Sequence, residues 1–112
     1  MKLLIVGSRS IKNLDISSYI PADTSMIITG GAAGIDTLAE QYADKHKISK
    51  LILRPKYNLY RKAAPLIRNN EMVDICDFIL IFWDGKSKGT KHTIEYAKSQ
   101  RKPLNIIKVS NS

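Results

Sequence analysis

The sequence is poor in the residues that build disulfides, metal sites and nucleophilic catalytic centres. It contains one cysteine, Cys76, which excludes an internal disulfide, and two isolated histidines, His46 and His92, which offer no metal-ligand spacing. No Ser-His-Asp or Cys-His pattern can be recognised, and no pair of carboxylates stands out for acid–base catalysis. We therefore expect no metal and no cofactor. Cys76 lies between the apolar residues Ile75 and Phe78, which favours a buried structural thiol over a reactive one.

Long apolar runs are also missing. No run approaches the roughly 20 residues that a helix needs to span a bilayer, so we expect no membrane partner. The opening "MKLLIVGSRS" has one lysine and a very short apolar run, which indicates a first strand and not a signal peptide. With 112 residues, 44% hydrophobic and 25% charged, the chain is expected to form one globular domain over residues 1–112, with a cytoplasmic setting as the default.

Acidic residues are absent from residues 45–68, although this segment holds eight basic ones. The other ten basic residues balance all ten acidic ones, so the net charge of +8 resides in this segment, and we expect it to bias one side of the molecule towards anions. A solubilising face and a surface for single-stranded nucleic acid both remain open. Aromatic stacking there would depend on Tyr57 and Tyr60. The basic residues are Lys45, Lys47, Lys50, Arg54, Lys56, Arg61, Lys62 and Arg68.

Five short apolar runs alternate with helical patterns. The runs are continuous and not alternating, which is typical of parallel strands covered on both faces; they span residues 2–7, 25–30, 49–55, 77–83 and 103–109. The helices expected between them span 35–46, 65 to about 75 and 90–100, with a weaker short helix at 13–19. This order predicts an α/β fold with an open five-stranded parallel sheet and helices on both faces. In such sheets ligands bind outside the carboxyl ends of the strands, near the point where the strand order reverses.

The glycines are confined to one predicted rim of this sheet. All six lie at or just after the ends of the first, second and fourth strands: Gly7, Gly30, Gly31, Gly34, Gly85 and Gly89. Turn chemistry accounts for some of this placement. Its restriction to one rim favours a binding crevice lined by backbone.

The segment "GGAAGID" at 30–36 has the parts of a phosphate site but fits neither common phosphate motif. Position 32 is alanine and the segment follows the second strand, so it is not the G-x-G-x-x-G fingerprint; no Gly-Lys-Ser/Thr closes it, so it is not a P-loop. Its small residues precede a helix N-terminus, which favours an anion held by backbone N–H groups. Asp36 either compensates the helix dipole or accepts hydrogen bonds from a ribose or base. Because a carboxylate repels phosphate, the two roles must be separated in space.

Two further segments place arginines near this rim. Arg9 closes the first strand in "GSR", where it can grip a phosphate bidentately or remain a surface arginine. Arg68 and Asn69 lie side by side early in the helix that begins near residue 65. A ligand at the rim would give them a partner, and solvent exposure is the alternative.

The second glycine-rich turn, "DGKSKGT" at 84–90, leads into the last helix. Thr90 is placed there as an N-cap or a phosphate contact. Glu95 lies further along the helix near Lys91 and Lys98, which favours an exposed ion pair over a role in chemistry.

Four motifs in this order resemble the SLOG superfamily, the Rossmann-like group named after the Smf/DprA DNA-processing proteins and the "lonely guy" nucleotide hydrolases. The matching segments are "GSR" (7–9), "TGGAAGIDTLAEQYA" (29–43), "RNNEM" (68–72) and "KGTKHTIEYA" (88–97). The single-domain form most resembles the stand-alone YspA-like branch. The resemblance implies a three-layer Rossmann-like fold that binds a nucleotide or a nucleotide-derived molecule, and homodimers are common among such folds.

The sequence departs from the hydrolases at their catalytic signature. Lonely-guy proteins carry "PGGxGTxxE", whose glutamate works with an arginine on the N-glycosidic bond of a nucleoside 5′-monophosphate. Here the Pro-Gly-Gly is missing, His92 and Thr93 follow "GT", and Glu95 is displaced onto another helical face. Binding is therefore the leading interpretation, and sensing of the ligand is one purpose that such binding would allow. A hydrolase using Arg68 with Glu95 or Asp36 is the first alternative, and DprA-like binding of single-stranded DNA is the second.

The residues expected to bind the ligand are shared among these motifs. They are Gly7, Ser8, Arg9, Gly30, Gly31, Ala32, Gly34, Asp36, Arg68, Asn69, Gly89 and Thr90. Phosphate is assigned to the backbone around the glycines, with Arg9 and Arg68 adding charge. Asp36 and Asn69 are assigned to sugar or base.

Overall fold

The computed structural model describes residues 1–110 and contains one five-stranded parallel sheet. Its strands lie side by side in the order β3-β2-β1-β4-β5, so the order reverses between β1 and β4. The predicted α/β class, the all-parallel sheet and the five strands are confirmed. The strands are β1 (Lys2–Gly7), β2 (Met26–Thr29), β3 (Ser49–Ile52), β4 (Phe78–Trp83) and β5 (Leu104–Lys108).

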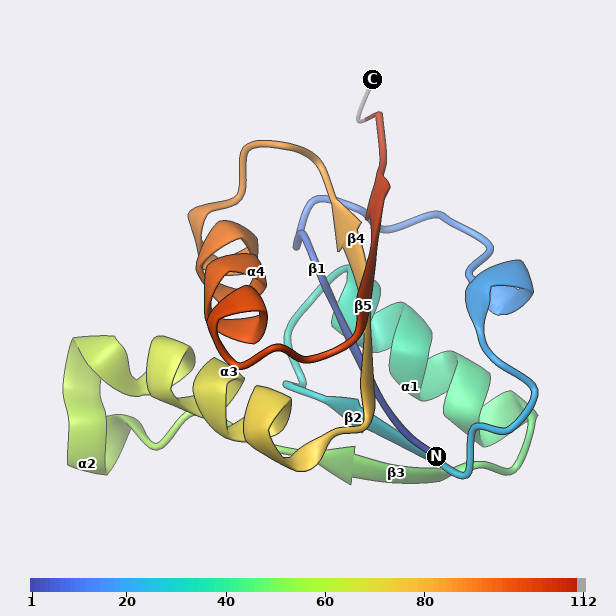
Figure 1. Cartoon of the computed structure of the whole chain (residues 1–112), viewed down its shortest axis with the longest axis horizontal. Coiled ribbons are helices and arrows are strands. Elements are labelled where there is room, and N and C mark those ends of the chain that lie inside the picture. Colours follow the sequence, from blue (N-terminus) through green and yellow to red (C-terminus); the bar gives the residue numbers. More distant parts are fainter. Residues whose placement is uncertain (111–112) are drawn as a thin grey trace.

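Helices cover both faces of the sheet and give the three-layer, Rossmann-like arrangement. In Figure 1, α1 (Ile35–Lys45) lies on one side of the strands, and α3 (Ala64–Ile75) and α4 (Lys88–Ser99) lie on the other. The expected helix at 13–19 is wrong, because only a 3-10 turn forms, at Ser17–Tyr19. The Asp15 carboxylate accepts the Ser17 N–H at 3.0 Å, a local bond that competes with helix formation.

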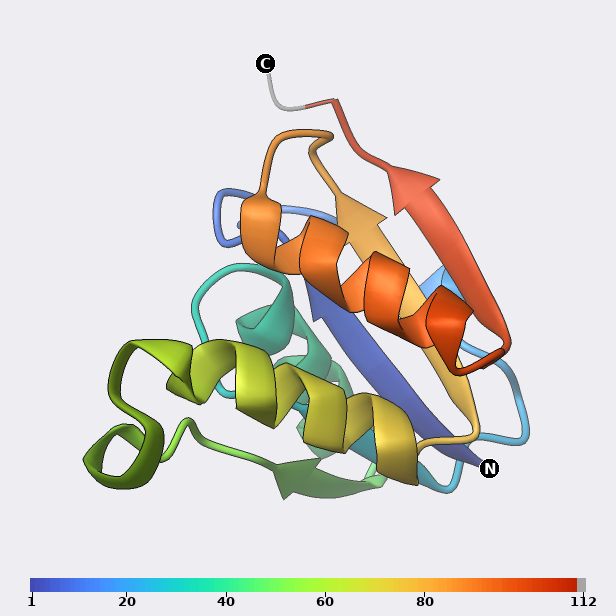
Figure 2. The ribbon, with the colours of Figure 1, turned by 60° about the vertical axis from the view of Figure 1, so that its left-hand side comes forward.

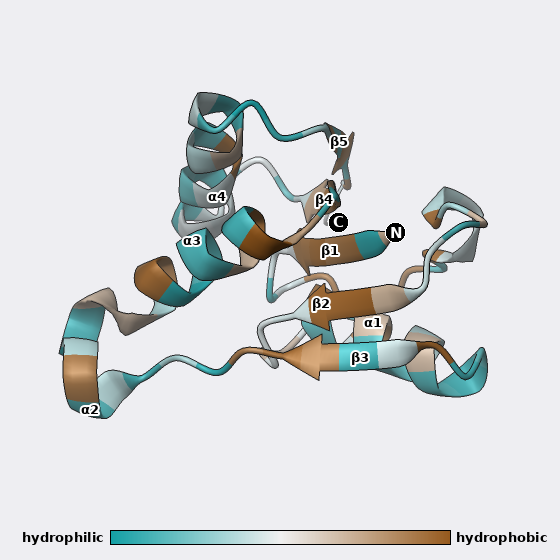
Figure 3. Cartoon of the chain, turned by 60° about the horizontal axis from the view of Figure 1, so that its bottom comes forward, coloured by the Kyte–Doolittle hydropathy of each residue, from teal (hydrophilic) through white to brown (hydrophobic). Residues whose placement is uncertain are grey.

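Alternate residues of the central strands face the two helical layers. On β1, Leu3 and Ile5 pack with the α1 side, and Leu4 and Val6 pack with the α3 and α4 side. The prediction that every strand is covered on both faces is wrong for β3, an edge strand whose Leu51 is exposed. Figure 3 shows this contrast, since apolar colour runs along β1 and β2 while β3 begins with polar residues.

A short projection between β3 and α3 was not predicted. It consists of α2 (Tyr57–Tyr60) and a 3-10 turn at Arg61–Ala63, and neither contains a buried residue. Figures 1 and 2 show it extending beyond the body of the sheet at the start of α3. Within residues 1–110, no helix has the length and apolar character needed to cross a membrane.

Candidate functional site

A crevice of about 400 Å³ lies at the carboxyl ends of the central strands. The end of β1, the loop after β2, the first half of α3 and the start of α4 line it, so it lies where the strand order reverses between β1 and β4. Its lining also includes apolar side chains, among them Val6, Pro65 and Met72. The crevice therefore combines an apolar surface with a few polar groups, as ligand pockets of this size usually do.

The crevice gathers nine of the twelve residues expected to bind the ligand. These are Gly7, Ser8, Arg9, Ala32, Asp36, Arg68, Asn69, Gly89 and Thr90. Gly30 and Gly31 line an adjoining compartment of about 230 Å³ instead, together with Arg54 and Tyr57. Gly34 lines a separate hollow beside α1. Its positive φ of 75° and the 2.5 Å that would separate an added Cβ from the Arg9 carbonyl oxygen indicate a structural requirement for glycine.

Arg68 is the most firmly held of these side chains. It is only 6% exposed, and its Nη1 donates to the carbonyl oxygens of Gly30 at 2.6 Å and Leu53 at 3.2 Å. Its Nε donates to the Asn69 side chain at 2.7 Å. Burial lowers the pKa of the guanidinium from its ordinary value, and the nearby Asp36 carboxylate opposes that change. The result is a fixed cation in the wall of the crevice.

Asp36 is also buried, and it uses part of the loop backbone that was expected to bind phosphate. Its Oδ2 accepts a hydrogen bond from the Ala32 N–H at 3.1 Å. Burial raises the pKa of this carboxyl, while the Ala32 N–H and the charge of Arg68 work in the opposite direction. The sequence predicts that backbone N–H groups of this loop bind phosphate. At Ala32 this is corrected, because its N–H donates to the Asp36 carboxylate instead. Asp36 still lines the crevice.

Asp84, which sequence reasoning missed, organises the opposite wall. One carboxylate oxygen accepts the N–H groups of Lys86 at 2.8 Å and Ser87 at 2.9 Å, and the other accepts the Ser10 hydroxyl at 3.1 Å. These bonds, led by that of Lys86, lower the pKa of Asp84 to about 2. The Asp84 N–H in turn donates to the Ser8 Oγ at 3.1 Å, which ties the end of β1 to the end of β4. An aspartate opening a glycine-containing turn is the signal that could have indicated its local bonds to Lys86 and Ser87.

The start of α4 differs from the prediction. Ser87, not Thr90, is the N-cap, and its Oγ accepts the Thr90 N–H at 3.4 Å and the Thr90 hydroxyl at 3.1 Å. The helix consequently begins before residue 90. Gly89 and Thr90 lie in its first turn and line the crevice, as does the buried Thr93, which the sequence interpretation also missed.

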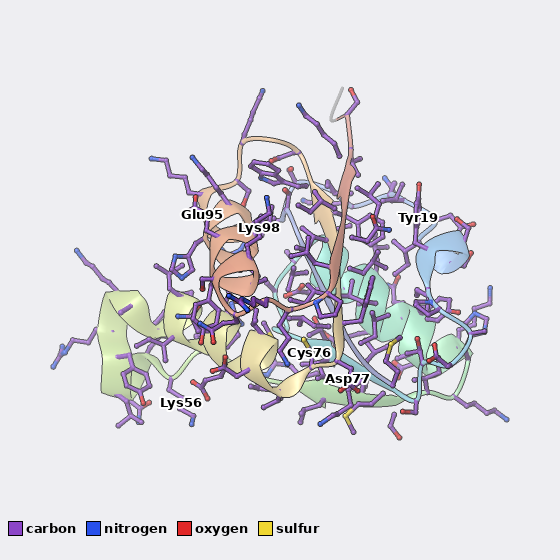
Figure 4. The ribbon with its side chains drawn as sticks, in the orientation of Figure 1. Tyr19, Lys56, Cys76, Asp77, Glu95 and Lys98 are labelled. Atoms are coloured by element: carbon purple, nitrogen blue, oxygen red, sulfur yellow. The ribbon has the colours of Figure 1, made fainter. Side chains whose placement is uncertain are left out.

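Glu95 does not line the crevice. It is exposed on α4, and Figure 4 shows it on the side of the helix that faces away from the sheet. Its expected ion pairs with Lys91 and Lys98 are not formed either. All the salt bridges found in residues 1–110 involve Lys50. The buried Asp36, in contrast, lines the crevice with Arg68, and its charge acts on the Arg68 guanidinium.

The basic segment at 45–68 does not occupy a single side of the molecule. Because β3 runs through it, Lys45 and Lys47 lie at the amino end of that strand, and Arg54 and Lys56 follow its carboxyl end. Lys50 is already paired with Asp44 at 2.9 Å. Of this segment, only the basic residues that follow β3 lie at the end of the sheet where the crevice is found.

Neither metal-ligand clusters, nor the cysteine, nor similarity to known proteins adds a residue to this site. Over residues 1–110, no group of three or more His, Cys, Asp and Glu side chains could hold a metal ion. Cys76 is buried as expected, with its pKa raised to about 11 mainly by burial. Searches against protein-family models, curated proteins and solved structures find no match for the chain.

Proposed function

We propose that the chain is a SLOG-like domain that binds a nucleotide or a nucleotide-derived ligand in the crevice at the strand reversal. The observation that carries the proposal is Arg68, a buried cation anchored by two backbone carbonyls and lining a crevice of about 400 Å³. A buried guanidinium fixed in this way meets an incoming anion without having to lose side-chain freedom. The SLOG resemblance supports the same ligand class, and the lone reduced thiol fits a cytoplasmic setting.

The charges of the crevice suggest how a nucleotide would be oriented. Arg9 is exposed at the mouth, whereas Asp36 is buried. We assign phosphate to Arg9, Arg68 and the first turn of α4, where the N–H groups of Lys88 and Gly89 have no acceptor within the helix. The Thr90 N–H is not counted, because it donates to the Ser87 Oγ. We assign ribose or base to Asp36 and Asn69, since a carboxylate accepts hydrogen bonds from hydroxyl and amino groups and repels phosphate.

Two measurements test this function. The first is mass spectrometry of small molecules that co-purify with the protein, and the second is calorimetric titration with the four ribonucleoside 5′-monophosphates. Arg9→Gln is expected to weaken binding by about tenfold through loss of a charged hydrogen bond. Lys12→Gln is the matched control, because Lys12 is exposed nearby and does not line the crevice. No binding of any monophosphate at millimolar concentration would contradict the proposal.

Hydrolysis of a nucleoside 5′-monophosphate is the second candidate function, and the placement of Asp36 favours it. A carboxyl with a raised pKa beside a fixed arginine is a common arrangement for acid–base chemistry. The reaction would add water across the N-glycosidic bond and release free base and ribose 5-phosphate. Asp36→Asn should then abolish base release in a chromatographic assay, whereas Glu95→Gln should leave it unchanged. No release of base by the wild-type protein would leave binding as the function.

A further inference from the structure

The compartment next to the crevice has a distinct chemical character. It holds about 230 Å³ and is lined by the loop at 30–33 and by Arg9, Arg54, Pro55, Tyr57 and Arg68. It shares Arg9, Ala32 and Arg68 with the main crevice, so the two spaces adjoin across the glycine loop. A ligand seated in the crevice and extending over the glycine loop would therefore contact both linings.

The lining of the compartment carries three cations and no carboxylate. Arg9 and Arg54 take part in no salt bridge within the described chain, and Arg54 makes only a long bond of 3.4 Å to the Gly31 carbonyl. Because both guanidinium groups line one compartment, an anion placed in it would be stabilised by both. The main crevice differs, because Asp36 and Asp84 also line it.

Tyr57 gives the compartment an aromatic side. It is 57% exposed at the start of α2, and α2 and the following 3-10 turn contain no buried residue. The core therefore does not account for an aromatic ring at this position. Exposed aromatic rings beside cationic groups are the surfaces on which nucleobases stack.

We propose that the ligand is a dinucleotide, a conclusion that rests on the proposed nucleotide-binding function. Its first nucleotide occupies the crevice, its bridging phosphate lies between Arg9 and Arg54, and its second base stacks on Tyr57. The projection around α2 is then a recognition element for the second half of the ligand.

The experiment compares adenosine 5′-monophosphate with the 5′-phosphorylated dinucleotide pApA by calorimetry. The dinucleotide should bind the wild-type protein about tenfold more tightly, because one stacked base contributes that order of affinity. Tyr57→Ala and Arg54→Gln should each reduce the ratio of the two affinities towards one. Tyr60→Ala and Lys62→Gln are matched controls on the same projection, and they should leave the ratio unchanged because neither residue lines the compartment.

The outcomes separate this inference from the function on which it rests. Equal affinities for the two probes would overturn the dinucleotide assignment and leave nucleotide binding intact. A preference for pApA that survives Tyr57→Ala would overturn the stacking role. A twelve-residue oligodeoxyadenylate that binds far more tightly than pApA, with a steep loss of affinity in salt, would replace the dinucleotide by an extended single strand. Failure of both small probes to bind would overturn the proposed function and this inference together.

Discussion

Gly30→Ala is the substitution that most directly tests whether Arg68 is a fixed cation. An added Cβ would lie 2.6 Å from the Arg68 Nη1 and 2.8 Å from its Cζ, and 3.1 Å from the Asp36 Oδ2. To restore ordinary contact at 3.4 Å, the guanidinium must retreat by about 0.8 Å from 2.6 Å. The same Nη1 holds the Gly30 and Leu53 carbonyls, so this retreat disrupts both bonds.

The expected cost follows from these contacts. Overpacking of a tight site costs about 1–3 kcal/mol, and a hydrogen bond to a charged group contributes about 1.5–3 kcal/mol. Partial relaxation of the long arginine side chain offsets some of this, so we expect the free energy of unfolding to fall by about 2 kcal/mol. For a domain of this size, that is a fall in melting temperature of about 8 °C. Nucleotide affinity should fall as well, because the cation leaves its position in the wall.

The assay is urea denaturation together with calorimetric titration of adenosine 5′-monophosphate. Gly89→Ala is the stability control, since a Cβ there meets no atom within 4 Å and alanine favours the helix by about 0.5 kcal/mol. A double-mutant cycle with Arg68→Met isolates the cause: without the guanidinium, Gly30→Ala should cost much less. An unchanged stability and affinity in Gly30→Ala, or an equal cost in both backgrounds, would refute the reasoning.

Three further predictions follow from the same geometry. The pKa of Asp84 is about 2 in the folded protein and near 3.8 when unfolded, so its stabilisation is present above pH 4 and is lost as the pH falls towards 2. In urea denaturation measured at a series of pH values, Asp84→Asn should therefore lose less unfolding free energy between pH 4 and pH 2 than the wild type does. An equal loss in both proteins would contradict the prediction. The raised pKa of Cys76, about 11, predicts slow alkylation by iodoacetamide at pH 8 until the protein is unfolded in urea, as followed by mass spectrometry; rapid labelling of the native protein would contradict its burial. Thr93→Val should weaken nucleotide binding less than Arg9→Gln does, because the Thr93 hydroxyl already donates to the Gly89 carbonyl at 3.1 Å; an equal loss by calorimetry would show direct recognition by Thr93.

The fold could be predicted from the sequence because its signals are local. Each strand is a continuous apolar run, and α1 follows one apolar stripe that includes the buried residues Ile35, Ala39 and Ala43. The rim location of the crevice followed from the glycines, since parallel strands place all their carboxyl ends at one edge. The predicted motifs converged for the same reason: Arg9, Asp36 and Thr90 follow three different strands.

What the sequence could not indicate depends on side-chain direction and on long-range partners. The bond from the Ala32 N–H to Asp36 turns a potential phosphate ligand inwards, and no spacing rule distinguishes that arrangement from an open cradle. The role of Asp84 requires Ser8 and Ser10, which lie more than 70 residues away in the sequence. The projection at α2 has no core periodicity, so pattern reasoning could not detect it.

The hydrogen bond from the Ala32 N–H to Asp36 also determines which positive groups remain available to an anionic ligand. Since Asp36 occupies that part of the glycine loop, an anion gains most from the arginines outside it, and these lie at the mouth and in the adjoining compartment. Arg9 belongs to both spaces, so it can contact a phosphate at their junction. A ligand with its anionic group in the middle and a ring at each end satisfies this distribution better than one with a terminal phosphate alone. The position of the positive charge, more than the glycine motif, therefore favours a ligand with two nucleoside halves.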